Sequence, residues 1–369
     1  MKLLFINQSL GIGGAETFNK ELLVWLQSEG LSIKTYVTNK IFQDRLKESK
    51  IDSRHIPIIV DLIGNWKGFL KGIFLFPFAF LYYTYLVTLN RNTDIILMSG
   101  FIEKILVTPI AKLFNIKVVW VEFAPLNSVF NKFWGFNKFI YKLVINLPSK
   151  IIVPTKNTLQ KLSKETGLPN NKFTLIPCAR EIDINNYSNI KTKKNLVCCV
   201  SRLEKGKGQD LLLRAWQKVE KEIPSAKLNI IGEGGFLNEL KQIVIELKLN
   251  NVEFTGFVKD PLEEIALSEI FVFPTIWELE GFGLAAVEAM ALKKPVVCFD
   301  FGPIPEIVDS TTGVLVKTNN INELANTIIK LLNSPQLGKI MGEGGRKKYL
   351  NNFTFKNIGK KYLKLINHA

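Results

Sequence analysis

The stretch IFVFPTIWELEGFGLAAVEAM, residues 270–290, holds in order a strand, a glycine-containing loop and a helix. IFVFPT is apolar without polar alternation, which is typical of a strand covered on both faces. Gly281 and Gly283 allow close backbone approach, and the helix that begins near Leu284 turns its free N–H groups toward the space beyond the strand. In a doubly wound sheet, ligands bind beyond the carboxyl ends of the strands. This unit therefore predicts a site that holds a phosphate or a sugar hydroxyl.

Short apolar runs alternate with helical patterns along the rest of the chain. The expected strands are KLLFIN, SIKTYV, DIILM, KVVWV, KIIVP and FTLIP in the first half, and NLVCCV, KLNIIG, VEFTG, IFVFPT and PVVCF in the second. Helices between such runs imply parallel βαβ units, so we predict an α/β fold with two doubly wound, Rossmann-like domains. The polar residues 178–195 are the expected linker. The predicted boundaries are 1–190 for the first domain, 191–350 for the second, and 351–369 for a C-terminal helix that packs back on the first domain.

Composition agrees with two globular domains, since 369 residues with 47% hydrophobic and 22% charged side chains can form two cores. The N-terminal run MKLLFIN leads into GIGGAE without a small-residue cleavage site, which predicts a mature, cytoplasmic protein. The four cysteines lack C-x-x-C spacing and are expected to be buried apolar residues in a reducing compartment, with no metal. They are Cys178, Cys198, Cys199 and Cys298.

Positive charge is concentrated in the first half of the chain. Residues 1–190 carry 23 basic and 13 acidic side chains, whereas residues 191–369 carry 25 and 20, within a net charge of +15. Such an excess suits nucleic acid, an anionic membrane or a phosphorylated substrate. Helix-turn-helix, zinc-finger and RNA-binding signatures are absent from the sequence, so we predict no nucleic-acid partner.

Two aromatic segments suggest a membrane contact. Residues 73–89, IFLFPFAFLYYTYLVTL, carry no charge but contain Pro77, and they lie at the lower limit of the ~17–25 residues that a span needs. A buried core helix is favoured over a span, and a surface helix that dips into the lipid headgroups is a third interpretation. Residues 130–143, FNKFWGFNKFIYKL, interleave lysines with aromatic rings and fit either a membrane interface or a solvated helix face. We predict peripheral contact with an anionic membrane through residues 67–91 and 130–143.

The carboxylates Glu280 and Glu288 flank the Gly-Phe-Gly turn. Glu288 lies in an apolar helix, where a lone charge costs several kcal/mol unless donors meet it, so it is either a structural ion pair or an acceptor for a diol such as ribose. If most of the interval is helical, the two are about 10–12 Å apart. Glycoside hydrolases place their carboxylates ~5–5.5 or ~6.5–9.5 Å apart. The pair therefore suits two ends of one extended ligand better than hydrolysis.

Further clusters follow other predicted strands. In SRLEKGKGQDLLL, residues 201–213, Arg202 and Lys207 stand beside a helix N-terminus and form either a diphosphate site without a metal or an ordinary solvated loop. The glycine turns IGEGG and GFVKD either frame a flat base or are plain turns. The N-terminal GIGGAE resembles the start of a dinucleotide fingerprint, but Glu16 replaces its third glycine and no acidic residue closes the second strand, which disfavours nicotinamide.

Together these clusters resemble the family 4 (group 1) retaining glycosyltransferases of the GT-B fold. In that fold, two Rossmann-like domains face each other across a cleft and a sugar moves from a nucleotide donor to an acceptor. The resemblance implies that residues 1–190 form the acceptor-binding domain and residues 191–350 the nucleotide-sugar-binding domain. The family pattern E-x7-E is met by Glu280 and Glu288. The pattern R-L-x-x-x-K-G is met at residues 202–208, and IGEGG and the PEIV run at residues 305–308 accompany it.

The resemblance implies a role for each matching residue. Glu280 is implied at the reacting end of the donor sugar and Glu288 at the ribose. Arg202 and Lys207 are implied on the diphosphate, in place of a metal. The other implied donor-binding residues are Phe282, Gly283 and Leu284 at sugar and phosphate, Gly232, Gly234 and Val258 around the base, and Gly13 and Gly14 in the first domain.

One position departs from the family. Members often carry a histidine after the strand that here reads VVWVEFAP, and this chain has only His55 and His368. Glu122 stands in that region, so it either takes over the polar contact as a catalytic residue or the histidine is dispensable.

The resulting prediction is a metal-independent, retaining hexosyltransferase that acts on a lipid-linked or polysaccharide acceptor in cell-surface polysaccharide or glycolipid assembly. The expected location is the cytoplasm, peripheral to the inner face of the cell membrane, and no cofactor is expected besides the nucleotide-sugar substrate. The alternatives are a nucleotide-sugar epimerase of the same fold and a catalytically lapsed GT-B domain that binds a partner.

Overall fold

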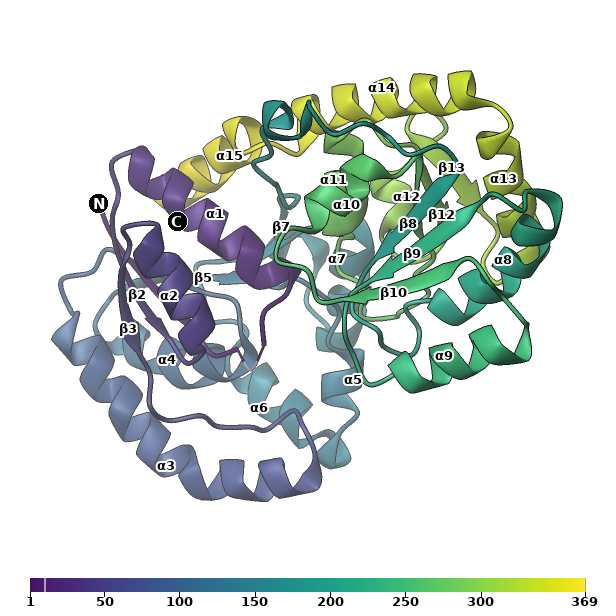
Figure 1. Ribbon diagram of the computed structural model, residues 1–369. Coiled ribbons are helices and arrows are strands. Elements are labelled where there is room, and N and C mark those ends of the chain that lie inside the picture. The colour runs from purple at the N-terminus through teal and green to yellow at the C-terminus, as the bar shows by residue number, and fades with distance from the viewer. Residues whose placement is uncertain (10, 369) are drawn as a thin grey trace. The chain divides into compact units, whose positions relative to one another are not determined.

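The computed structural model describes residues 1–9 and 11–368, which form two α/β units (Figure 1). The first unit contains Met1–Ala179 and Phe355–Ala369, and the second contains Arg180–Thr354. The chain therefore passes between units after Ala179 and again after Thr354, whereas the sequence analysis places these passages after residues 190 and 350. The last helix, α15 (Phe355–Asn367), belongs to the first unit.

The first unit is built on a seven-stranded parallel sheet in the order β3-β2-β1-β4-β5-β6-β7. Its strands are β1 Lys2–Asn7, β2 Ser32–Val37, β3 Asp52–His55, β4 Ile95–Met98, β5 Lys117–Val121, β6 Lys150–Val153 and β7 Phe173–Leu175. The apolar runs predicted all of them except β3. That strand reads DSRH and lies at the edge of the sheet, where no apolar run is required.

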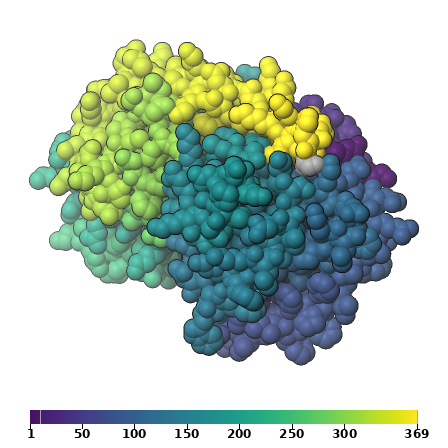
Figure 2. All heavy atoms as spheres, turned by 180° about the vertical axis from the view of Figure 1, so that it is seen from behind, coloured from purple at the N-terminus to yellow at the C-terminus, as the bar shows by residue number. Residues whose placement is uncertain are grey.

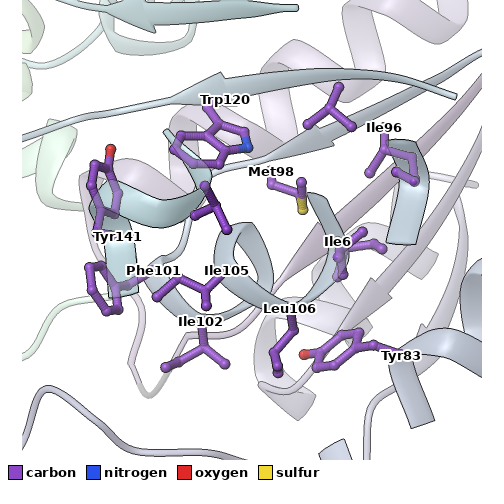
Figure 3. Close-up of a cluster of buried hydrophobic side chains, with 14 of the residues drawn as sticks. Ile6, Tyr83, Ile96, Met98, Phe101, Ile102, Ile105, Leu106, Trp120 and Tyr141 are labelled. Atoms are coloured by element: carbon purple, nitrogen blue, oxygen red, sulfur yellow. The ribbon is translucent and has the colours of Figure 1, made fainter. Parts of the chain in front are cut away.

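Helices cover both faces of this sheet. They are α1 Gly14–Ser28, α2 Lys40–Glu48, α3 Trp66–Leu89, α4 Phe101–Leu113, α5 Asn127–Phe130, α6 Phe136–Val144 and α7 Lys156–Thr166, with 3-10 turns at Phe133–Gly135 and Asn170–Lys172. Because side chains alternate along a strand, Leu4 and Ile6 pack with α3, α4 and α6, in the cluster that Figure 3 shows. On the opposite face, Phe5 contacts Phe42 of α2 with ring centroids 6.5 Å apart. On α1, Phe18 stacks on Phe355 of α15 at 5.6 Å.

Helix α3 is largely exposed, contrary to the buried core helix that the sequence analysis favours. Only 28% of its most apolar window is buried, although its length and composition would also allow it to cross a membrane. Phe69, Tyr83 and Leu86 face the core, so one side of the helix is committed to the fold. The violet-blue atoms of this part of the chain lie at the surface of the first unit in Figure 2. An apolar helix that leaves most of its length uncovered is unusual for a globular protein.

The second unit is built on a six-stranded parallel sheet in the order β10-β9-β8-β11-β12-β13. Its strands are β8 Leu196–Val200, β9 Lys227–Ile231, β10 Val252–Gly256, β11 Ile270–Phe273, β12 Val296–Phe299 and β13 Gly313–Val316. Its helices are α8 Gln209–Glu222, α9 Leu237–Glu246, α10 Pro261–Leu267, α11 Leu284–Ala291, α12 Ile304–Ile307, α13 Ile321–Leu332 and α14 Pro335–Asn352, after a 3-10 turn at Ile184–Tyr187. The short edge strand β13 was not predicted.

All four cysteines are buried and free, as expected from the sequence. Burial raises the pKa of Cys199 to about 12, so its thiol stays protonated near neutral pH. Among the described residues, no group of three or more histidine, cysteine, aspartate or glutamate side chains is arranged to hold a metal ion.

Helix α14 approaches the end of α11 closely through its glycines. A Cβ atom at Gly342 would overlap the carbonyl oxygen of Lys293, which directly follows the end of α11. A Cβ atom at Gly345 would lie 3.3 Å from Cα of Met290 in α11. Arg346 adds a hydrogen bond from Nη1 to the carbonyl oxygen of Ala291 at 2.9 Å. These contacts fix α11 and α14 as one body.

We expect Gly342→Ala to lower the free energy of unfolding of the second unit by about 1–3 kcal/mol, because the added methyl group overpacks a backbone contact. Gly338→Ala on the same helix is the matched control. Its Cβ atom would lie 3.5 Å from Cγ of Pro295, an ordinary contact, and alanine raises helix propensity by up to about 1 kcal/mol. Urea unfolding followed by circular dichroism measures both variants. Equal midpoints for the two variants would contradict the close approach.

Candidate functional site

The strand order of the second unit reverses between β8 and β11, because β8 connects to β9 on one side and β11 to β12 on the other. A crevice at such a switch point is where open α/β sheets bind ligands. The loop after β8 carries Arg202 and Lys207, and the loop after β11 carries Glu280. The fold therefore brings together three residues that the sequence analysis assigns to one site.

Lys207 and Glu280 form an ion pair at this switch point. Nζ of Lys207 lies 2.7 Å from Oε2 of Glu280, and the two side chains are 9% and 12% exposed. Burial lowers the pKa of Lys207, and the Glu280 carboxylate opposes that shift. The carboxylate therefore favours the charged ammonium group in a largely buried position.

Trp277 gathers the two cations. Cζ of Arg202 lies 4.8 Å from the centre of the indole ring, and Nζ of Lys207 lies 4.1 Å from it. Both distances are within the range in which a ring face attracts a cation. The ring thus offsets part of the repulsion between two neighbouring positive charges. The role of Trp277 does not follow from the sequence patterns above. An aromatic residue in a loop at the predicted site was the one signal that it could contact the cations.

Glu288 is paired with Arg180, which the sequence analysis did not name. Nε of Arg180 lies 2.7 Å from Oε1 of Glu288, with side chains 11% and 13% exposed. Burial raises the pKa of Glu288, and the guanidinium group opposes the shift. The ion pair that the sequence analysis kept as one alternative is therefore present, and contact with a ribose stays a prediction. The lone carboxylate in an apolar helix was itself a signal that a cation from a distant part of the sequence contacts it.

The Gly-Phe-Gly turn lies between the two carboxylates. Gly283 is the N-cap residue of α11 and Leu284 its first residue, so the first-turn N–H groups of this helix lie at the same edge of the sheet. The ring of Phe282 is buried and meets Phe353 edge to face, with centroids 5.8 Å apart. Contact of the backbone of residues 282–284 with sugar or phosphate stays a prediction.

The glycine turns after β9 and β10 lie at this edge too. The N–H group of Leu203 donates to the carbonyl oxygen of Glu233 at 2.8 Å, so the loops after β8 and β9 run side by side. Cβ atoms at Gly232 and Gly234 would overlap the backbone of the first of these loops, which explains both glycines by loop packing. Val258 is half-buried in the loop between β10 and α10. Their place around a base is untested.

In the first unit, the glycine loop after β1 is closed by a capping box. Gly13 is the N-cap residue of α1, and its N–H group donates to Oε2 of Glu16 at 2.9 Å. Gly14 is the first residue of the helix. Glu16 therefore stands where a dinucleotide fingerprint has glycine because it caps this helix.

Glu122 is buried in an ion pair. Its Oε1 atom lies 2.7 Å from Nζ of Lys104 and accepts a hydrogen bond from the Tyr141 hydroxyl at 2.6 Å. Nζ of Lys104 also donates to the carbonyl oxygen of Val121 at 2.7 Å. These partners account for the buried charge of Glu122, and its contact with the donor sugar in place of the histidine stays a prediction. His55 lies in β3 and does not take that place.

A second buried carboxylate, Glu103, lies at the switch point of the first sheet. Its Oε1 atom accepts a hydrogen bond from the N–H group of Gly100 and caps α4. Nearby, the side-chain amides of Asn7 and Asn19 each donate to Oγ of Ser99 at 3.0 Å. Burial raises the pKa of Glu103 from 4.5 to about 7, although hydrogen bonds and Lys104 oppose the shift.

This pKa predicts a pH-dependent stability of the first unit. Between pH 4.5 and 7 the folded state binds more protons than the unfolded state, so stability is greatest at low pH and is lost as pH rises through 7. The shift corresponds to about 3 kcal/mol. Glu103→Gln, which keeps an acceptor for Gly100, should remove this part of the pH dependence in urea unfolding. Glu29→Gln, at an exposed carboxylate, should retain it; parallel profiles for Glu103→Gln and wild type would contradict the assignment.

Two doubly wound parallel sheets, with cations and carboxylates at the switch point of the second, define the class of this protein: it has the GT-B glycosyltransferase fold. The structure of HepE from Anabaena, solved in complex with UDP and glucose, superimposes with a TM-score of 0.82 over 100% of both chains at 20% identity. The sequence model of the family Glycosyl transferases group 1 matches residues 181–348. The match covers most of the second unit and less than half of the chain.

Curated relatives carry similar sequences. An uncharacterized glycosyltransferase of Methanocaldococcus jannaschii is 29% identical over 287 residues, which are 70% of each chain. A Campylobacter jejuni enzyme, N-acetylgalactosamine-N,N'-diacetylbacillosaminyl-diphospho-undecaprenol 4-alpha-N-acetylgalactosaminyltransferase, is 30% identical over 211 residues, 55% of this chain and 56% of that protein. For the other curated relatives the match spans between 26% and 54% of their length.

Proposed function

We propose that this protein is a retaining, metal-independent glycosyltransferase that moves a hexose or related sugar from a nucleotide sugar to a lipid-linked or polysaccharide acceptor. One observation carries the proposal. Two cations, Arg202 and Lys207, are gathered by Trp277 beside the carboxylate of Glu280 at a sheet switch point. This arrangement suits a ligand that joins a diphosphate to a sugar. The match to the family model over residues 181–348 and the Campylobacter relative, whose name gives a diphospho-undecaprenol-linked acceptor, support it.

The cations would act on the leaving group. As the bond between the anomeric carbon and the donor phosphate oxygen breaks, negative charge grows on the diphosphate. Fixed positive groups stabilise that charge without reorganisation. Lys207 is buried, and Arg202 is exposed but lies over the Trp277 ring. With these two groups, a divalent cation is not required for the charge balance.

In this proposal Glu280 contacts both Lys207 and the donor sugar. Its Oε2 atom holds Lys207, and we assign Oε1 to a hydroxyl group of the donor sugar. The acceptor hydroxyl oxygen would attack the anomeric carbon on the face that the phosphate leaves. Its proton passes to the departing phosphate oxygen, and the configuration of the anomeric carbon is retained. The family resemblance supports this course of reaction.

Glu280→Gln should lower the rate of sugar transfer by about 10²–10³-fold, because an interaction made at the reacting end is lost. Affinity for the nucleoside diphosphate should change little, since the amide oxygen still accepts from Lys207. A panel of UDP- and GDP-sugars screened by thermal shift identifies the donor. Product formation and calorimetry with the free nucleotide then measure the two effects.

Glu278→Gln, at an exposed carboxylate in the same loop, is the matched control and should behave like wild type. If Glu280→Gln lost sugar transfer and nucleotide affinity equally, the assignment of Glu280 to the reacting end of the donor would be wrong. Conversion of the donor without an acceptor would indicate an epimerase instead. Nucleotide binding without any turnover would indicate a lapsed domain.

We also propose that the first unit lies on the inner face of the cell membrane through α3 and the segment 130–143. The exposed face of α3 carries an apolar stripe at helical spacing, with every member more than half exposed: Leu70, Phe74, Phe78, Leu81 and Tyr85. Trp134, which is 91% exposed, contacts Trp66 of α3 with ring centroids 4.9 Å apart. These residues therefore make one continuous apolar surface, which suits insertion at headgroup depth.

Lysines around this surface supply the attraction to anionic lipid. Lys142 on α6 and Lys67 on α3 are exposed, and Lys138 is half-buried. Lys132 is hydrogen-bonded within the protein: its Nζ atom donates to the carbonyl oxygen of Ile63 at 2.6 Å, in the segment just before α3. The charge contribution thus rests on the lysines other than Lys132.

The variant Phe74→Ser/Phe78→Ser should reduce co-sedimentation with vesicles of phosphatidylglycerol and phosphatidylcholine by at least tenfold, because the inserting rings are removed. Lys138→Glu/Lys142→Glu should reduce it more on anionic than on neutral vesicles. Ile245→Ser, at a residue of the second unit that is 68% exposed, should have no effect. Unchanged co-sedimentation of the α3 variant would sink the membrane-surface proposal.

A further inference from the structure

The two segments at which the chain passes between the units are hydrogen-bonded to each other. The N–H group of Arg180, the first residue of the second unit, donates to the carbonyl oxygen of Phe353 at 2.9 Å. Phe353 stands next to Thr354, the last residue of that unit. The two passages therefore form one paired feature, which we call the crossing.

Tyr349 of α14 fastens this crossing. Its hydroxyl group donates to the carbonyl oxygen of Arg180 at 3.1 Å and accepts from the N–H group of Ile182 at 3.0 Å. The side chain is buried, and Arg346 lies over its ring at 5.1 Å. Because α14 is packed on α11 through Gly342 and Gly345, the crossing is joined to the helix that carries Glu288.

The crossing also contacts the proposed donor site directly, at two points. From the first passage, Arg180 pairs with Glu288 at 2.7 Å. From the second passage, Phe353 meets Phe282 of the Gly-Phe-Gly turn at 5.8 Å. The residues that the family resemblance assigns to ribose and to sugar and phosphate, Glu288 and Phe282, thus lie against both passages of the chain.

The Arg180 guanidinium group offsets the electrostatic effect of nearby carboxylates. The Asp260 carboxylate contributes to the raised pKa of Glu288, and Asp260 accepts a hydrogen bond from the Tyr187 hydroxyl at 2.9 Å. Arg180 opposes the rise in pKa at both Glu288 and Tyr187. Arg180 therefore favours the charged form of Glu288, and the hydrogen bond from its Nε atom fixes the direction in which the Glu288 oxygens point.

We propose that Arg180 is a positioning residue that orients Glu288 for the nucleoside hydroxyls and links occupancy of the donor site to the crossing. The inference rests on the proposed function. A nucleoside bound over Glu288 excludes water from the ion pair between Arg180 and Glu288, and the lower local dielectric strengthens that pair. The stronger pair in turn reduces the motion of the backbone of residues 180–182. Coupling of this kind is reciprocal, so a steadied crossing also favours nucleotide binding.

Hydrogen exchange and calorimetry with UDP and GDP test the inference. In the wild type, the nucleotide that binds should slow exchange of the Ile182 amide by about tenfold, and protection should extend to residues 349–354. Arg180→Gln should weaken nucleotide affinity about 10–100-fold. It should also raise the KM for the donor with little change in kcat at saturation and abolish the nucleotide-dependent protection. Arg180→Lys should restore part of both effects.

Two further variants separate positioning from loss of structure. Arg214→Gln removes an exposed arginine on α8 of the same unit, and it should leave affinity and protection unchanged. Arg180→Gln/Glu288→Gln removes both charges of the ion pair and so leaves neither of them unpaired. It should fold and bind no more weakly than Arg180→Gln alone, because the two residues act as a unit.

Affinity and protection in Arg180→Gln equal to those of the wild type would overturn the inference while leaving the proposed function intact. If the losses of nucleotide affinity in the two single variants added up in the double variant, the inference would likewise be overturned and the proposed function would stand. A wild type that binds no nucleoside diphosphate would overturn the proposed function, and this inference with it.

Discussion

Parallel pairing of β11 with β8 and β12 is the constraint on which the rest of the second unit depends. It sends every strand out at the same edge of the sheet, so charged residues distant in sequence meet there. Such charges are tolerated in a largely buried place only when each has a partner. Lys207 meets Glu280 across 73 residues of sequence, and Arg180 meets Glu288 across 108. The sheet thus creates both the concentration of charge and the means of balancing it.

The apolar runs predict the strands of both sheets except for two at sheet edges. β3 is polar and β13 is only four residues long, whereas the edge strands β7 and β10 are predicted because they lie in runs that look like strands. The sequence also places Arg202, Lys207 and Glu280 at one edge, because the loops that carry them follow strongly apolar runs. Their partners were harder to find. Trp277 and Arg180 take their roles from tertiary contacts, and nothing in local spacing shows which cation faces which carboxylate.

Two predictions show what tertiary contacts add to the sequence. Glu122 stands just after β5, where a ligand contact is expected, and the structure adds an ion pair with Lys104 of α4 that the sequence does not reveal. The apolar segment within α3 has the composition of a core helix, but composition does not say how much of the helix is covered. The stripe from Leu70 to Tyr85 becomes apparent only once Phe69, Tyr83 and Leu86 are seen to occupy the opposite face.

The hydrogen bond between Arg180 and Phe353 makes the second unit an insertion within the first, with its two ends side by side. A segment whose ends meet can be replaced by another of the same fold without changing the gap that the host must close. If the second unit binds the donor as proposed, donor recognition is a module that can be exchanged between chains, while the first unit, which carries the exposed apolar helix, stays the same. Chimeras cut at this hydrogen bond are the natural way to move a sugar specificity from one member of the fold to another.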